Sequence, residues 1–308
     1  MTPKQVFPVF KDAVAAWVDD YAPSMGAALS YYTLFSIAPL LIIVISLAGL
    51  FFGTDAVRTV IFDQLNALMG QEGAEAVQDM IANANEPSTG GIATVLSVAG
   101  LAIGATTVFN EIQSDLDRIW RAPAAEEGGG IWSLLRTRLL SFGMILGVAF
   151  LLTVSLVVSA GLSLIGKWWD GWLGGWEIVA HTLDIVVNLG LLTVVFALIY
   201  KKIPRVEVSW HDVWIGALVT AALFTVGKVA IGVYLGKSDV TSAFGSAGSL
   251  VVLMVWVYYA AQIFLLGAEF TRVYAEKFGS RRSIKERRSS QSRSRRRSDQ
   301  FAGEPSPA

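Results

Sequence analysis

The sequence has no cysteine and only two histidines among its 308 residues. The absence of cysteine excludes disulfide bonds, thiolate metal sites and a cysteine nucleophile. The two histidines, His181 and His211, are too few for a histidine-rich metal centre. We therefore expect neither a bound metal nor another cofactor.

Charge is also scarce. Charged residues make up 16% of the chain, against roughly 25% in a soluble domain, whereas 54% of the residues are hydrophobic. From Arg281 onward there are nine Lys or Arg and three Asp or Glu, so a basic tail follows an acidic body. This composition excludes an ordinary soluble enzyme, a disordered protein and a fibrous repeat. It indicates a helical protein that crosses a membrane several times.

Six segments are long and apolar enough to cross a bilayer, which takes about 20 helical residues. They lie at Leu29–Phe52, Ile92–Asn110, Leu139–Gly166, Ile178–Tyr200, Val213–Leu235 and Ser249–Phe270. Open strands cannot cross lipid, because their backbone groups would remain unpaired. The sequence therefore predicts an all-α, polytopic fold in which residues 24–275 form a membrane domain of six transmembrane helices.

Basic residues indicate the orientation of these spans. Most Lys and Arg lie in the N-terminus, the second and fourth connections and the tail, whereas the opposite connections hold one each: Arg58, Lys167 and Lys237. Cytoplasmic loops carry the excess of Lys and Arg. We therefore expect both termini to be cytoplasmic.

Residues 1–23 have helical periodicity and place Phe10, Val14, Trp17 and Tyr21 on one face. This pattern predicts an amphipathic helix at the cytoplasmic interface.

Residues 53–91 form a connection too long for a turn and contain two runs of helical periodicity. We expect two extracytoplasmic amphipathic helices, which are more typical of a lid over the bundle than of a receptor for a soluble partner.

We expect residues 276–308 to form a disordered basic tail that attracts anionic lipids. No aromatic residues interleave with its charges, so we expect no specific binding of nucleic acid.

Three stretches of the sequence resemble a known family. They are AALSYYTLFSIAPLLIIVISLAGLFFG in the first predicted span, FNEIQSDLDRIW after the second, and GSAGSLVVLMVWVYYAAQIFLLGAEFTRVYA around the last. They resemble the YihY/BrkB family of bacterial inner-membrane proteins, which has the legacy name ribonuclease BN-like. The resemblance runs from about Val14 to Ala275. It implies a six-span helical protein of the bacterial inner membrane and supplies no agreed catalytic residues.

Ionisable residues within membrane spans usually face the interior of the bundle or a wet cavity. One candidate intramembrane polar site combines His181, Asp184 and Asn188, which share a face of the fourth predicted span, with Lys228 in the fifth. Matched depths predict an ion pair between Asp184 and Lys228. The alternatives are polar packing between helices and outward snorkelling of Lys228.

A second candidate cluster lies toward the cytoplasmic side and contains Tyr31, Tyr32, Asn110, Glu111, Gln262 and Glu269. Glu269 has two interpretations: it pairs with Arg272 or Arg118, or it forms a charged lip of a cytoplasm-facing cavity. Pro39 predicts a kink in the first span, either as a packing feature or as a gating hinge. The Gly232–Gly236 repeat in the fifth span indicates close helix approach.

These observations favour a membrane protein that handles or transports a lipid or small solute through a polar intramembrane cavity. The alternative is a structural or regulatory membrane component without flux. No P-loop is present. The connection from Glu111 to Arg138 has five acids but no histidine and is too short for a nuclease fold, so we expect no enzymatic activity. The expected partners are membrane lipids, with a homo-oligomer as a further option.

Overall fold

The computed structural model describes residues 3–84, 107–123, 176–237, 244 and 247–282. The regular secondary structure of these residues is helical, in agreement with the all-α prediction. The helices are α1 (Pro3–Asp19), α2 (Ala22–Phe52), α3 (Thr54–Ala84), an unlabelled helix over 107–119, α6 (Trp176–Lys202), α7 (Trp210–Lys237) and α9 (Gly248–Lys277). The third predicted span and most of the second lie outside the described residues.

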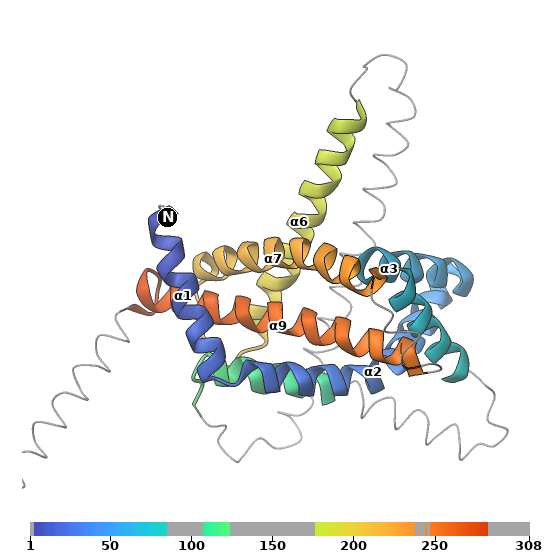
Figure 1. Cartoon of the computed structure of the whole chain (residues 1–308), viewed down its shortest axis with the longest axis horizontal. Coiled ribbons are helices and arrows are strands. Elements are labelled where there is room, and N and C mark those ends of the chain that lie inside the picture. The colour runs from blue at the N-terminus through green and yellow to red at the C-terminus, as the bar shows by residue number, and fades with distance from the viewer. Residues whose placement is uncertain (1–2, 85–106, 124–175, 238–243, 245–246, 283–308) are drawn as a thin grey trace, which may run out of the picture.

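Helix α9 lies at the centre of the described structure (Figure 1). It runs between α7 and α2, antiparallel to both, and contacts each of them. Helix α1 crosses the C-terminal end of α9, and α3 lies at the opposite end. Helix α6 packs against α7, while its first half extends away from the bundle.

Three segments of the described residues are long and apolar enough to cross a membrane: Ile185–Lys202, Trp210–Leu235 and Leu250–Lys277. They correspond to the fourth, fifth and sixth predicted spans. The first predicted span lies within α2 and is helical throughout, including position 39. The total of six spans stays a prediction.

The largest apolar cluster joins parts of five helices that are distant in the sequence. It contains the start of α2, the helix over 107–119, the end of α6, the first half of α7 and the second half of α9. Its largest fully buried side chains are Leu116, Ile119 and Trp120 from the 107–119 helix and its last turn, with Tyr200 and Leu265. The cluster fixes the 107–119 helix against the end of the bundle where α1 and α2 meet.

Helix α1 packs on α9 through Val9 and Ala13, which are fully buried and contact the apolar side chains of α9. On the neighbouring face, Phe10 and Trp17 are partly buried against apolar clusters of the bundle. Val14 is 37% exposed. The interfacial position of this helix stays a prediction.

Helix α3 consists of two helical halves separated by a break at Gly70, whose φ of 80° lies in the left-handed region that favours glycine. This agrees with the prediction of two helices within residues 53–91. The two halves pack on α2 and α9 through Met69, Val77 and Ile81.

Helices α7 and α9 cross at two reciprocal glycine–threonine contacts. A Cβ atom added at Gly216 of α7 would lie 1.8 Å from the Thr271 hydroxyl of α9, and one added at Gly267 of α9 would lie 2.0 Å from the Thr220 hydroxyl of α7. Each threonine hydroxyl donates a hydrogen bond to the glycine carbonyl one turn before it on its own helix. The backbones approach closely because only glycine leaves room for the opposing threonine.

Candidate functional site

A cluster of buried charges lies where the α1–α2 corner meets α9. Glu269 is fully buried, and Asp20 and Arg272 are 4% and 8% exposed. The Arg272 guanidinium donates through Nη2 and Nε to the Glu269 carboxylate at 2.7 and 3.0 Å. Its Nη1 also lies 3.3 Å from Glu276, and Asp20 is close enough to interact with both Glu269 and Arg272. Of the two interpretations of Glu269, pairing with Arg272 is confirmed.

The segment 107–121 attaches to this cluster through charged and aromatic side chains. Arg121 forms a 2.8 Å ion pair with Asp20, and the Arg118 guanidinium lies 5.9 Å from the centre of the Tyr21 ring. The segment therefore contacts both residues of the corner that joins α1 to α2.

The same segment also contacts the ends of α6 and α9. Asp117 accepts a 2.7 Å hydrogen bond from the Arg205 backbone N–H and pairs with its side chain at 3.4 Å. The Arg281 guanidinium lies over the Trp120 ring at 5.6 Å from its centre. The 107–121 segment is thus a connection between three separate parts of the chain.

Two residues at the contact between Asp20 and Arg121 have a left-handed backbone. Tyr21 has a φ of 59° and Arg121 a φ of 53°. Such conformations cost a non-glycine residue on the order of 1–3 kcal/mol each. The ion pair between Asp20, which precedes Tyr21, and Arg121 stabilises both left-handed conformations.

Several buried polar atoms at this junction have no hydrogen-bond partner among the described residues. They are the acceptors Asp20 Oδ2, Asp115 Oδ2 and Glu269 Oε1 and the donors Trp17 Nε1 and Trp120 Nε1. Buried polar groups in folded proteins are nearly always paired.

Asp115 is the carboxyl of the segment that burial affects most. It is 5% exposed, and burial raises its pKa to about 7, with a further increase from the charge of Glu111 and a decrease from Arg118. The group therefore changes charge close to neutral pH.

Replacing Asp115 with asparagine is expected to stabilise the protein at pH 8 and to have little effect at pH 4. The unfolded chain loses this proton near pH 4 and the folded chain near pH 7, so the carboxyl destabilises the fold increasingly as pH rises through that window. Thermal unfolding in detergent at several pH values measures this, at about 2–4 °C for each kcal/mol gained.

Asp117→Asn is the matched control for this prediction. It removes the acceptor of two Arg205 contacts and should lower the melting temperature at neutral pH. A melting temperature of Asp115→Asn below that of the unaltered protein at pH 8 would contradict the role of burial at this position.

The structure brings only part of the predicted cytoplasmic cluster together. The charge of Glu111 raises the pKa of Asp115. The Gln262 amide donates a hydrogen bond to the Ala22 carbonyl at the start of α2, at 3.5 Å. Tyr31 is 53% exposed, and its ring contacts Tyr32 and Phe35 on its own helix. Asn110 is exposed as well.

The predicted intramembrane site lies on α6 and α7. His181 and Asp184 are helical positions in the first half of α6, and their side chains lie outside the described part of the structure. Asn188 and Lys228 are half-buried. Since the first half of α6 diverges from α7 (Figure 1), the Asp184–Lys228 pair stays a prediction.

Two smaller predictions concern helix geometry. The Pro39 hinge stays a prediction, although the nearby Ser36 hydroxyl donates to the Tyr32 carbonyl at 2.8 Å. The packing role of Gly232 stays a prediction, because no described atom lies within 4 Å of an added Cβ and two of the predicted spans lie mostly or wholly outside the described residues.

Sequence reasoning missed Asp20, Arg121 and Asp115 as residues of this junction. A signal for Asp115 was the motif FNEIQSDLDRIW, which contains Asp115, Asp117, Arg118 and Trp120. Its partner Arg205 lies 88 residues from Asp117, and its partner Arg281 lies 161 residues from Trp120. Local periodicity cannot reveal contacts over such separations.

The apolar helices and their packing define an all-helical membrane protein. The sequence profile of the family described as Virulence factor BrkB matches residues 13–292. The chain therefore belongs to the BrkB family, as its sequence resemblance implies.

Curated relatives in other bacteria carry the name UPF0761 membrane protein. One from Rhodospirillum centenum is 28% identical over 280 residues, which cover 87% of this chain and 57% of the relative. One from Tolumonas auensis is 28% identical over 270 residues, covering 83% of this chain and 82% of the relative. The chain thus spans little more than half of some relatives and most of others. No solved structure matches the chain.

Proposed function

We propose that this protein handles a membrane phospholipid, which it binds in a groove between α6 and α7. The groove has a volume of about 630 Å³ and is lined by Val187, Gly190, Leu191, Thr193, Val194, Trp214, Ile215 and Leu218. Thr193 is its one polar side chain, and its hydroxyl already donates to the Leu189 carbonyl at 2.7 Å. An acyl chain suits this lining because it requires no polar partner.

Cationic and aromatic residues near one end of the groove suit an anionic headgroup. Trp210 lies one turn before Trp214 on α7. The Lys201 ammonium lies 5.7 Å from the centre of the Trp210 ring. Lys202 is next to it and exposed. Tryptophan prefers the headgroup level, and lysines there attract anionic lipids. We assign the phosphate of an anionic phospholipid to this end.

This proposal places the protein in the inner membrane with both termini in the cytoplasm, as the Lys and Arg distribution predicts. Lys201 and Lys202 then meet the cytoplasmic leaflet. The proposal contains no catalytic step and no cofactor.

A tryptophan in place of Gly190 should block the groove and reduce lipid binding about tenfold, which corresponds to ~1.4 kcal/mol. The first atom of the new side chain meets no steric conflict, because no described atom lies within 4 Å of a Cβ at this position; thermal unfolding of the variant verifies that it is folded. The measurement is photo-crosslinking of full-length protein in nanodiscs to phosphatidylglycerol that carries a diazirine in one acyl chain. Peptides containing Trp214 and Leu218 are expected to carry the label.

Gly232→Trp is the matched control, since Gly232 is also an open helical glycine, away from the groove. It should leave labelling unchanged. Equal labelling in Gly190→Trp and Gly232→Trp, or label found only on peptides outside the groove, would refute the proposed site. A proteoliposome assay of lipid movement between leaflets then distinguishes transport from the alternative, a structural component without flux.

A further inference from the structure

The two halves of α3 enclose a second cavity, at the end of the bundle opposite α1 (Figure 1). Its volume is about 500 Å³, and its lining residues are Asp55, Arg58, Thr59, Phe62, Asp63, Gln78, Ile81 and Ala82. Unlike the α6–α7 groove, it has polar and charged side chains on its walls. The break at Gly70 creates it by turning the second half of α3 back beside the first.

Arg58 is the most informative residue of this cavity. Its Nε is buried and has no hydrogen-bond partner among the described residues. The ion pairs of those residues do not include Arg58 either. A guanidinium group has five N–H donors arranged to match a phosphate or carboxylate. Arg58 is therefore a preformed donor for an anionic group.

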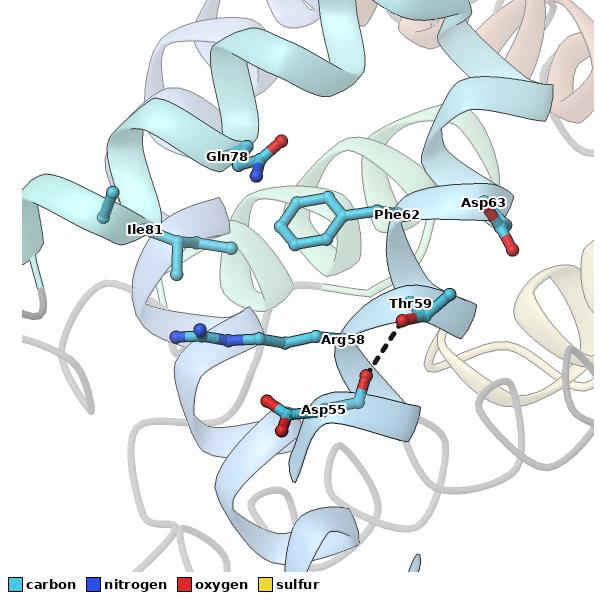
Figure 2. Close-up of a pocket in the computed structure, with 8 residues that line it drawn as sticks. Asp55, Arg58, Thr59, Phe62, Asp63, Gln78 and Ile81 are labelled. Atoms are coloured by element: carbon cyan, nitrogen blue, oxygen red, sulfur yellow. Dashed lines mark hydrogen bonds between the residues drawn. The ribbon is translucent and has the colours of Figure 1, made fainter. Parts of the chain in front are cut away.

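The remaining polar residues limit what that ligand can be. Figure 2 shows Asp55 and Arg58 extending from the first half of α3 toward the same side of the cavity, with Gln78 facing it from the second half. The Thr59 hydroxyl is already used, since it donates to the Asp55 carbonyl at 3.0 Å. The available groups are thus one guanidinium, one amide and the carboxylates of Asp55 and Asp63.

A ligand with a single sign of charge fits these groups poorly. A simple anion at Arg58 would meet the nearby negative charge of Asp55, and a simple cation at Asp55 would leave Arg58 unpaired. A zwitterion satisfies both groups. Phe62 and Ile81 form an apolar wall on which the hydrocarbon part of such a ligand packs (Figure 2).

We propose that the cavity between the two halves of α3 binds a zwitterion that carries a phosphate or carboxylate and an ammonium group. Arg58 holds the anionic group, and Asp55 holds the ammonium. This site goes beyond the lipid groove, because it lies on a different helix and shares no residue with it. The ligand is either a lipid headgroup of the phosphoethanolamine type or a free zwitterion of the same chemistry.

The test is calorimetric titration of the full-length protein in a non-ionic maltoside detergent, which carries neither charge of the proposed ligand. The probe is glycerophosphoethanolamine, which has both charges. Glycerol phosphate and ethanolamine each have one of them and serve as partial probes. We expect saturable binding of glycerophosphoethanolamine and binding at least about tenfold weaker of each partial probe.

Arg58→Gln and Asp55→Asn should each weaken binding of glycerophosphoethanolamine about tenfold, while Arg58→Lys should retain part of it because the charge remains. Asp79→Asn is the matched control, since Asp79 is an exposed aspartate of the same helix outside the cavity. It should bind as the unaltered protein does. Thermal unfolding of each variant verifies that it is folded.

Nanodiscs that contain phosphatidylethanolamine identify the source of the ligand. Competition by the lipid supports a headgroup site, and undiminished binding of the soluble probe supports a free zwitterion. The proposal is overturned if glycerophosphoethanolamine does not bind the folded protein in non-ionic detergent, or if folded Arg58→Gln and Asp55→Asn bind it as tightly as Asp79→Asn. Because these variants leave the α6–α7 groove intact, failure here is distinguishable from failure of the proposed function.

Discussion

Replacing Arg272 with methionine is expected to destabilise the protein by about 3–5 kcal/mol, because it leaves buried carboxylates without their cation. Glu269 is fully buried and takes two hydrogen bonds from the guanidinium, and Asp20 interacts with it as well. Methionine keeps much of the aliphatic volume, so the change tests charge more than packing. Thermal unfolding of the purified protein, followed by size-exclusion chromatography, measures the loss.

Lys277→Met on the same helix is the control. Lys277 pairs with Asp12, but Asp12 is half exposed, and exposed ion pairs contribute about 0–1 kcal/mol. The double variant Arg272→Met with Glu269→Gln should recover part of the stability lost in Arg272→Met. If Arg272→Met and Lys277→Met unfold at the same temperature, the buried pair is not the main electrostatic support of this junction.

Replacing Gly267 with alanine should destabilise the protein by about 1–3 kcal/mol, because the added methyl group overpacks the α7–α9 crossing. It would lie 2.0 Å from the Thr220 hydroxyl and 2.7 Å from that of Tyr200. Tyr200 is held in place because its hydroxyl donates to the Phe264 carbonyl at 2.7 Å. The two helices therefore have to move apart. Thermal unfolding and the accessibility of the crossing to proteolysis both report the change.

Gly232→Ala serves as the control for this crossing. The position is open, so alanine should stabilise α7 by up to about 1 kcal/mol through its higher helix propensity. Adding Thr220→Ala to Gly267→Ala removes the nearest clashing atoms and should restore part of the loss. A Gly267→Ala protein as stable as Gly232→Ala would show that the crossing is more loosely packed than the structure describes.

Local pattern predicted the helices well and their contacts less well. Helical segments are found at all predicted positions that the structure describes, because apolar runs and 3.6-residue periodicity are properties of the segment itself. The pairing of Glu269 with Arg272 could be predicted for the same reason, since the two residues are three positions apart on one helix. The break within residues 53–91 also has a local cause, a glycine with positive φ.

Contacts between distant segments could not be predicted from the sequence. The Gly-x-x-x-Gly repeat at Gly232 did not point to the α7–α9 contact, where close approach occurs at Gly216, Gly227 and Gly267 because each faces a side chain of the other helix. Asp20 has an ordinary sequence context, and its burial depends on α9, roughly 250 residues later. In α1, periodicity identified the apolar face that includes Phe10, but the contact of Val9 and Ala13 with α9 depends on a helix distant in the sequence.

The central place of α9 has a consequence for biogenesis. Synthesis proceeds from the N-terminus, yet α9 is the helix against which α1, α2, α3 and α7 all pack. Ser30 of α2 donates to the Met254 carbonyl, 224 residues further along. The pairs α2–α3 and α6–α7 can pack as soon as both members are made, but the bundle cannot assemble around its central helix until α9 has been synthesised. A ribosome that stalls before α9 leaves a set of inserted helices in the bilayer without their common partner, which is the form that a membrane quality-control protease would recognise.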